Sequence, residues 1–274
     1  MKIVSDSVNI NFEYFNSFEQ NRNTVVMLHG FTGSLDDWRG IQGSLNPNFN
    51  YVGIDLVGHG KSDSPINVDK YSSQALSKQI TDFLDILSIK KVILCGYSMG
   101  GRAALSFAFH HPNKIRGLIL EGATAGFDSE KLRSERIKSD EELANYIEKH
   151  SMEEFVDLWM NKEIFNTQRR FSNEKLKKIR KKKSLNSKIG LANSLRGFGT
   201  GRMDYPGSKL NKINCPVLLI TGELDTKFTK INSVLKKKFP GAKHKKIKNA
   251  GHNTHLEEPK RFVETVNKFL KSLH

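Results

Sequence analysis

The fold is decided by the stretch Val92-Ile93-Leu94-Cys95-Gly96-Tyr97-Ser98-Met99-Gly100-Gly101-Arg102. Its apolar beginning predicts a short buried strand, and its end predicts the first turn of a helix. Ser98 lies at the junction, between Gly96 and Gly100, in the pattern G-x-S-x-G. Such a turn forces the serine into a strained conformation, and only glycine lets the neighbouring backbone pack so closely. The hydroxyl is therefore expected to project from a sheet edge, beside the positive end of a helix.

A serine in this position needs a proton acceptor, and that acceptor needs a third group to fix its tautomer. The pattern is the nucleophile elbow of α/β-hydrolases, in which the acid and then the histidine follow the serine along the chain. Asp225 follows the apolar run Val217–Ile220, and His252 follows a possible last strand at residues 244–248. Because both lie just past a strand, we predict that Ser98, Asp225 and His252 form a catalytic triad at one sheet edge.

Two backbone N–H groups would form the oxyanion hole in such a fold. Met99 directly follows the serine, and Phe31 follows His29-Gly30 just after the apolar run Val25–Leu28. We predict that the N–H groups of Phe31 and Met99 point at the negative charge that develops during the reaction.

Other polar residues are assigned structural roles. Asp55 ends a predicted strand but precedes the serine, which is the wrong order for the acid. Glu223 is expected on the surface. His255 lies near a helix start and is expected to hydrogen-bond backbone, while His29 and His59 are expected to brace their loops.

The rest of the chain alternates apolar runs with helical spacings, which is typical of an α/β fold with a mostly parallel sheet. Strand-like runs occupy residues 25–28, 51–56, 118–121 and 217–220, and helical spacings occupy residues 73–87, 101–109, 234–239 and 262–273. From about Asp128 to Arg196 only helical spacings recur, so we expect a helical lid over the sheet edge where ligands bind. The predicted division is a core of residues 1–127 and 206–274 with an inserted lid of residues 128–205.

The balance of charges is strongly basic, with 44 Lys and Arg against 29 Asp and Glu and a formal net charge of +15. That balance is compatible with a lysine-coated surface, nucleic acid, an anionic membrane surface or an anionic small substrate. The basic run Lys175–Lys183 lacks interleaved aromatic residues and lies in the predicted lid, so no nucleic acid partner is predicted. Two interpretations of this run remain open: it forms an exposed lysine face, or it forms part of a pocket that binds an anion. The loop Gly58–Ser62 does not complete a phosphate-binding pattern, because position 55 is Asp55 and not glycine.

The two cysteines, Cys95 and Cys215, adjoin apolar strands and are expected to be buried thiols. The first residues lack the apolar core of a signal peptide, and no uncharged apolar run approaches the roughly 20 residues of a membrane helix. We therefore expect a cytoplasmic protein without membrane insertion, either a monomer or a weak homo-oligomer. No His, Cys or carboxylate cluster has ligand spacing, so neither a metal nor a cofactor is predicted.

Arg102 is unusual because a cation in the first turn of a helix opposes the helix dipole. Its position places it within reach of the floor of the predicted site. Two interpretations stay open: Arg102 binds a substrate carboxylate, or it forms a salt bridge with the lid.

Three motifs and a stretch of the lid carry a resemblance that covers essentially the full chain. They are Leu28-His29-Gly30-Phe31-Thr32-Gly33-Ser34 with Trp38, Gly96-Tyr97-Ser98-Met99-Gly100-Gly101-Arg102, Gly251-His252-Asn253-Thr254-His255-Leu256-Glu257, and Ile189–Gly197. Together they resemble the 2-succinyl-6-hydroxy-2,4-cyclohexadiene-1-carboxylate synthase family of menaquinone biosynthesis, which belongs to the α/β-hydrolase superfamily. The elbow with Arg102 and the lid stretch are the more selective parts.

The reaction that this resemblance implies is an elimination that consumes no water. A proton leaves the substrate, the C–O bond to the enolpyruvyl group breaks, pyruvate is expelled, and a cyclohexadiene is left. Ser98, polarised by His252 and Asp225, would then act as a base and not as an acyl acceptor.

The resemblance also implies how the substrate is held. Because the substrate carries several carboxylates, a basic pocket is expected, with no other partner than this small anionic molecule. The implied carboxylate clamps are Arg102 and Arg136, the implied lining residues are Tyr97 and Trp159, and a further lid cation would be Arg180 or Lys182.

Two other functions remain as alternatives. A serine hydrolase of an ester or C–C bond would have the same elbow and triad, but esterase pockets are usually apolar, so Arg102 and the basic lid favour the lyase. A non-catalytic receptor on the same fold would predict a broken triad.

Overall fold

The computed structural model describes residues 1–204 and 207–273. Its centre is an eight-stranded sheet with the order β1-β2-β4-β3-β5-β6-β7-β8. The strands β1 and β2 pair antiparallel with each other, β2 pairs antiparallel with β4, and all other neighbours are parallel. The strands are β1 Lys2–Ser5, β2 Val8–Tyr14, β3 Thr24–Leu28, β4 Asn50–Ile54, β5 Val92–Tyr97, β6 Ile115–Glu121, β7 Val217–Gly222 and β8 Lys243–Ile247.

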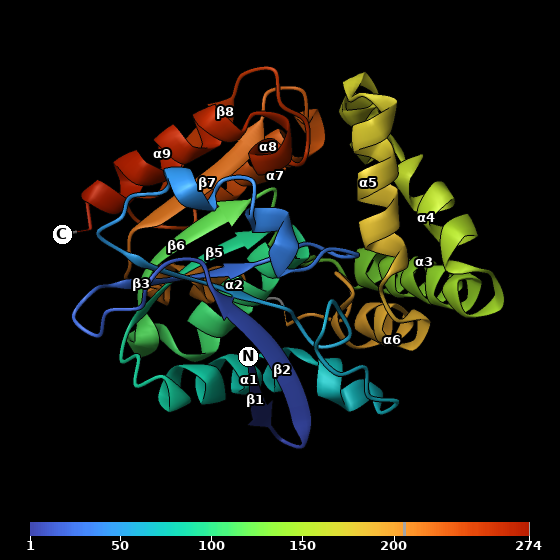
Figure 1. Ribbon diagram of the computed structural model, residues 1–274, viewed down its shortest axis with the longest axis horizontal. Coiled ribbons are helices and arrows are strands. Elements are labelled where there is room, and N and C mark those ends of the chain that lie inside the picture. Colours follow the sequence, from blue (N-terminus) through green and yellow to red (C-terminus); the bar gives the residue numbers. More distant parts are fainter. Residues whose placement is uncertain (205–206, 274) are drawn as a thin grey trace.

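Helices cover both faces of the sheet (Figure 1). Alternate residues of a strand point to opposite faces, so Val26 of β3 packs in one core with Phe83 and Leu105, and its neighbour Met27 packs in the other with Phe262. Because both faces are buried, the central strands are continuous apolar runs. The helices of these layers are α1 Ser73–Ile86, α2 Met99–His110, α7 Thr226–Lys236, α8 Thr254–Glu257 and α9 Pro259–Lys271.

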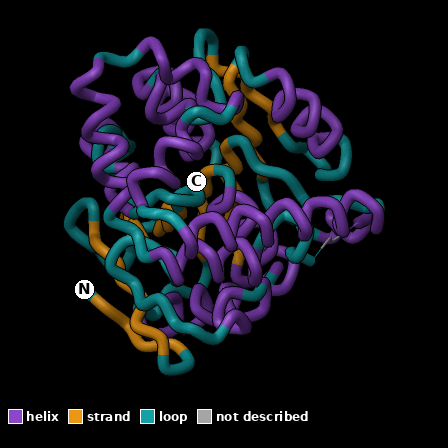
Figure 2. The backbone as a smooth tube through the Cα atoms, turned by 90° about the vertical axis from the view of Figure 1, so that its right-hand side faces the viewer, coloured by secondary structure: helices purple, strands orange, loops and turns teal. Residues whose placement is uncertain are grey.

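A separate group of helices follows β6 and precedes β7. It consists of α3 Glu130–Lys149, α4 Met152–Met160, the 3₁₀ segment η5 Glu163–Arg170, α5 Asn173–Ser184 and α6 Lys188–Phe198. The helices α3 to α6 lie together to the right of the sheet in Figure 1, and Figure 2, viewed from that side, shows helices in front of the strands. They share a small apolar cluster that includes Ile147, Phe155 and Leu191.

We call α3, α4, η5, α5 and α6 the lid helices, after the lid predicted for this segment, and serine residues define where four of them begin. The side chains of Ser129, Ser151, Ser172 and Ser187 accept hydrogen bonds from the first turns of α3, α4, α5 and α6. Ser151 and Glu154 form a complete capping box. Such caps satisfy N–H groups that have no partner within the helix, so these boundaries are encoded locally.

The predicted central strands and the helical segment after β6 are confirmed. The helix predicted to begin at Val234 begins at Thr226, so that prediction is wrong. The antiparallel strands β1 and β2 were not predicted. The predicted boundary between lid and second core segment, at residues 205 and 206, lies outside the described residues. Within the part of the chain that the structure describes, every helix is too short or too polar to span a bilayer.

Candidate active site

The elbow at Ser98 has the strained geometry that its glycines predict. Ser98 links the end of β5 to the start of α2 with φ 50° and ψ −105°, in the region that favours glycine. A Cβ atom on Gly96 would overlap the backbone of Gly100, and one on Gly100 would overlap the carbonyl group of Leu28. The small residues therefore allow strand and helix to meet closely enough to expose the hydroxyl.

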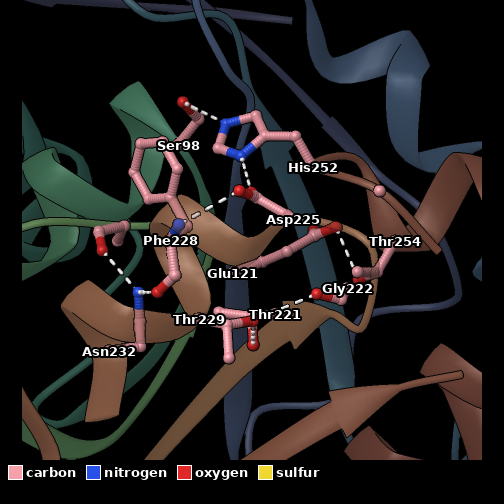
Figure 3. Close-up of polar contacts among 12 residues, drawn as sticks. Ser98, Glu121, Thr221, Gly222, Asp225, Phe228, Thr229, Asn232, His252 and Thr254 are labelled. Carbon is pink, nitrogen blue, oxygen red and sulfur yellow. Dashed lines mark hydrogen bonds and ion pairs between the residues drawn. The ribbon is translucent and has the colours of Figure 1, made fainter. Parts of the chain in front are cut away.

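The structure brings Ser98, His252 and Asp225 together (Figure 3). Nε2 of His252 lies 3.1 Å from Oγ of Ser98, and Nδ1 of His252 lies 2.7 Å from Oδ2 of Asp225. A carboxylate can only accept at that distance, so Nδ1 donates and Nε2 is left to accept the serine proton. The imidazole is only 2% exposed, which excludes most of the water that would compete for it.

Asp225 and Gly122 hold the imidazole in place. Asp225 is the N-cap of α7, and its other oxygen accepts a hydrogen bond from Phe228 N at 3.0 Å. The same carboxylate therefore begins a helix and orients His252. Gly122 has φ +55°, and a Cβ there would lie 2.7 Å from Cε1 of His252, so a larger residue would displace the ring.

A cavity of about 600 Å³ opens above this group. Its wall includes most of the residues predicted from the sequence, namely Phe31, Tyr97, Ser98, Met99, Arg102, Arg136, Trp159, Asp225 and His252. Met99 is the first residue of α2, and the N–H of such a residue has no acceptor within its helix. Phe31 lies in the turn closed by a 3.0 Å hydrogen bond from Gly33 N to the carbonyl of Gly30.

Arg102 is a buried cation at the cavity wall. Its residue is 9% exposed, Nη1 donates to the carbonyl of Phe198 at 2.6 Å, and the guanidinium lies 4.9 Å from the Phe198 ring. Burial and then the charge of Arg136 lower the pKa of Arg102 to about 9, while the nearby charge of Asp140 acts in the opposite direction, so Arg102 stays protonated at neutral pH. Within residues 1–204 and 207–273, no carboxylate forms an ion pair with it. The salt bridge with the lid, one of the two interpretations of Arg102, is not formed among the described residues: the contact is to the neutral carbonyl of Phe198, and the charge of Asp140 acts on Arg102 without a direct ion pair.

Arg136 presents a second guanidinium to the cavity. Its Nε donates to Oδ1 of Asp140 at 2.8 Å, one helical turn away on α3. Burial raises the pKa of Asp140, although the neighbouring arginines act in the opposite direction. Because the Asp140 bond uses Nε, the two terminal nitrogens of Arg136 are the donors left for a ligand.

Arg180 is not among the cavity-lining residues. It lies on α5, and its guanidinium forms an ion pair with Asp157 of α4. Sequence reasoning instead missed Lys162 and Lys227, two lysines that do line the cavity. The position of Lys227, two residues after the predicted acid, was the only available signal.

The remaining polar residues mostly have the structural roles predicted for them. Asp55 accepts from the backbone of Leu35 and Lys61, and His29 braces its loop by donating to Gly30 O and accepting from Leu56 N. Nδ1 of His59 likewise lies 3.1 Å from the carbonyl of Val57, and Glu223 is exposed.

The prediction for His255 is wrong. Its Nδ1 lies 2.6 Å from Oε2 of Glu121 and not beside a backbone group. Glu121 ends β6, far away in the sequence, so the local helix-start pattern gave no sign of this partner. Within the described residues, no group of three or more His, Cys, Asp or Glu side chains could hold a metal ion.

The sheet order and the elbow define the class of protein, the α/β-hydrolases. A family model described as alpha/beta hydrolase fold matches residues 23–259. Solved structures with little sequence similarity share this fold, such as the enol-lactonase from Burkholderia xenovorans LB400, with a TM-score of 0.85 at 21% identity over 99% of this chain and 100% of that one.

Proteins with higher sequence identity show which family of α/β-hydrolases this chain belongs to. A Bacillus subtilis (strain 168) protein provisionally named 2-succinyl-6-hydroxy-2,4-cyclohexadiene-1-carboxylate synthase is 41% identical over 91% of this chain and 90% of its own. The protein of that name from Enterobacter sp. (strain 638) is 31% identical over 86% of each chain. The solved structure of MenH from S. aureus matches with a TM-score of 0.91 and 29% identity, covering 96% of this chain and 98% of that one. This chain belongs to the 2-succinyl-6-hydroxy-2,4-cyclohexadiene-1-carboxylate synthase family.

Proposed function

We propose that this protein is the lyase of menaquinone biosynthesis for which its relatives are named. It would eliminate pyruvate from 2-succinyl-5-enolpyruvyl-6-hydroxy-3-cyclohexene-1-carboxylate and leave 2-succinyl-6-hydroxy-2,4-cyclohexadiene-1-carboxylate. The observation that carries the proposal is the buried guanidinium of Arg102 in the wall of the cavity above Ser98, which forms no direct ion pair with a carboxylate of the described residues. A buried cation without a direct ion pair is costly, so it favours a ligand that brings a carboxylate.

In the proposed mechanism Ser98 takes a proton from the substrate while His252 receives the hydroxyl proton of Ser98. The electrons of the broken C–H bond form a ring double bond, and the C–O bond to the enolpyruvyl group breaks. The enolpyruvyl group leaves, takes up a proton and becomes pyruvate, so atoms balance without water. Asp225 stabilises the imidazolium that forms at His252.

Negative charge moves onto a carbonyl oxygen of the substrate as the proton leaves. The N–H groups of Phe31 and Met99 are proposed to stabilise that oxygen, with the positive end of α2 beside it. Because these donors meet full charge only in the transition state, they would raise the rate more than the affinity.

The substrate carboxylates are proposed to bind Arg102 and the terminal nitrogens of Arg136, between the rings of Tyr97 and Trp159. Lys162 and Lys227 add positive charge to the wall. Since Arg180 pairs with Asp157, we leave it out of this clamp. The segment of residues 128–205 would act as the lid of the cavity. A cytoplasmic location is part of the proposal, and the free thiols of Cys95 and Cys215 are in keeping with it.

The test is to incubate the purified protein with the enolpyruvyl-ether substrate. Pyruvate is followed with a coupled dehydrogenase, and the ring products are followed by mass spectrometry. We expect one pyruvate for each cyclohexadiene formed and an intact succinyl chain. Cleavage of the succinyl chain with uptake of water, or no pyruvate at all, would contradict the proposal.

A further inference from the structure

Thr32 has a backbone conformation that its side chain opposes. It lies inside the Gly30–Gly33 turn with φ +64°, a region where β-branched residues are rare. Such a conformation costs on the order of 1–3 kcal/mol and persists only where the surroundings fix it. Thr32 is 1% exposed and directly follows Phe31, the proposed oxyanion donor. The turn therefore depends on whatever holds Thr32.

Two side chains at the end of lid helix α5 hold it. Nζ of Lys183 donates to Oγ1 of Thr32 at 2.9 Å, and Nδ2 of Asn186 donates to the carbonyl of Thr32 at 3.0 Å. Asn186 is itself buried and fixed from its other side, because its Oδ1 accepts from Gly60 N at 3.1 Å. Residues of the lid therefore hydrogen-bond to both the side chain and the backbone of Thr32.

We propose that Lys183 and Asn186 are positioning residues of the oxyanion hole. Neither lines the cavity, so neither would touch the substrate. They act through Thr32 by fixing the turn in which Phe31 presents its N–H. The lid then contributes to the stabilisation of the transition state as well as to the enclosure of the substrate. The inference rests on the proposed function for the role of Phe31.

A misplaced oxyanion donor has a distinctive kinetic effect. The donor meets a fully charged oxygen only in the transition state, so its displacement lowers kcat and leaves ground-state binding nearly unchanged. A contact that merely kept the lid closed would weaken substrate and product binding together with the rate.

The experiment compares Asn186→Ala and Lys183→Met with Lys181→Met, which changes an exposed lysine on the same helix. Pyruvate release gives kcat and KM, and calorimetry with the cyclohexadiene product gives its affinity. We expect kcat to fall about tenfold or more in the first two variants, with KM and product Kd within about threefold of the parent. The Lys181→Met variant is expected to match the parent protein.

A second measurement does not depend on the natural substrate. A small fluorophosphonate reacts with Ser98: the Oγ–P bond forms, the P–F bond breaks, the serine proton passes to His252 and fluoride leaves. Its phosphoryl oxygen needs the same oxyanion donors, so we expect slower labelling in Asn186→Ala and Lys183→Met, measured by mass spectrometry. If the parent protein releases no pyruvate while labelling still slows, the proposed function fails and this inference stands.

Unchanged kcat and labelling in folded Asn186→Ala and Lys183→Met would overturn the inference. A loss of rate matched by an equal loss of product affinity would overturn it too, because it would show a role in lid closure. Should those variants fail to fold, Thr32→Val and Thr32→Ser test the same contact. Valine deletes the hydroxyl that Lys183 binds and serine keeps it, so Thr32→Val is expected to be the slower of the two, and equal rates would contradict the proposal.

Discussion

Ser98 combines a strained backbone with the proposed reacting oxygen. Its positive φ costs on the order of 1–3 kcal/mol, which the surrounding hydrogen bonds must offset. The Ser98 N–H donates to the carbonyl of Glu121 at 2.8 Å, and the Ser98 carbonyl accepts from Arg102 N at 3.0 Å. The direction of the hydroxyl is therefore determined by the backbone before any ligand binds.

Replacing Ser98 by alanine removes the proposed base and leaves the elbow backbone in place. We expect kcat for pyruvate release to fall roughly 10³-fold or more while the Kd for the product stays within a few-fold. Steady-state kinetics and calorimetry measure the two quantities. A variant that kept its rate would exclude Ser98 as the base.

Arg102→Ala tests whether the buried guanidinium binds a substrate carboxylate. We expect kcat/KM to fall by an amount that corresponds to about 2–4 kcal/mol, because a charge-assisted contact in a partly dry site is lost. Arg116→Ala, which changes an exposed arginine on β6, is the matched control and should leave kcat/KM unaltered. Equal values for both variants would assign Arg102 to the contact with Phe198 alone.

At the level of elements, the loop that carries His252 is fixed from both of its ends. After the histidine, fully buried Glu121 at the end of β6 accepts from Thr254 Oγ1 at 2.7 Å and from His255 N at 3.0 Å. Before the histidine, Glu257 accepts from Gly251 N at 2.8 Å. Glu121 therefore joins the loop to the sheet, and Glu257 joins the start of the loop to the helix α8 that follows it.

The lid holds the same loop. Nη1 of Arg170, at the end of η5, donates to the carbonyl of Asn249 at 2.6 Å, and its Nη2 lies 3.3 Å from Glu257. Asn249 has φ +62°, so this contact, like the one at Thr32, falls on a strained residue. The lid is therefore joined to the core at both loops that flank the proposed reaction.

Glu121→Gln tests the tie between loop and sheet. An amide keeps the size of the side chain but removes a buried charge and turns one acceptor into a donor beside His255. We expect the free energy of unfolding to fall by about 3 kcal/mol, as for other broken buried pairs. Denaturant unfolding measures the change, and Glu264→Gln, an exposed acid on α9, should shift it by less than about 0.5 kcal/mol. A loss as small as that of the control would show that the pair is dispensable.

The sequence predicts the elements whose signal is local. The central strands are continuous apolar runs, and the elbow depends on glycines within two residues of Ser98. The strand β2 was missed because its apolar residues alternate with polar ones and form no continuous apolar run. The start of α7 was missed because Asp225 was interpreted as a catalytic acid alone, whereas it is also the N-cap. Contacts such as that of Glu121 with His255, and of Lys183 with Thr32, join residues more than 130 positions apart, and no local pattern encodes them.

At the scale of the whole molecule, some of the excess lysine and arginine residues form long-range contacts between the lid and the core. On α5, Lys175 donates to the carbonyl of Leu256 at 3.3 Å and Lys183 binds Thr32, so both bridge the lid and the core. Lys178 and Arg180 pair with Glu174 and Asp157 within the lid. Four lysines of the run, Lys177, Lys178, Lys181 and Lys182, are exposed. The basic run is therefore mostly an exposed face from which two lysines join the lid to the core, and none of its residues lines the cavity.

The stability of the whole molecule is expected to depend on pH because of the buried His59. Burial is the largest cause that lowers the pKa of His59 to about 3; its neighbours His29 and Lys183 act in the same direction, and its hydrogen bond to Val57 acts in the opposite one. In the unfolded chain its pKa is about 6.5. The fold therefore requires the neutral ring, and the stability this provides is complete above pH 6.5 and is lost as the pH falls toward 3.

We expect His59 alone to cost about 2 kcal/mol of the free energy of unfolding between pH 7 and pH 5. Denaturant unfolding of the parent protein and of His59→Asn at both pH values isolates the contribution of His59 to this change in the free energy of unfolding. Asparagine keeps an N–H donor near Val57 and cannot titrate, so the variant should lose about 2 kcal/mol less than the parent over the same interval. Equal losses in the two proteins would show that His59 accepts a proton without unfolding. The acid sensitivity would then come from the other titrating groups.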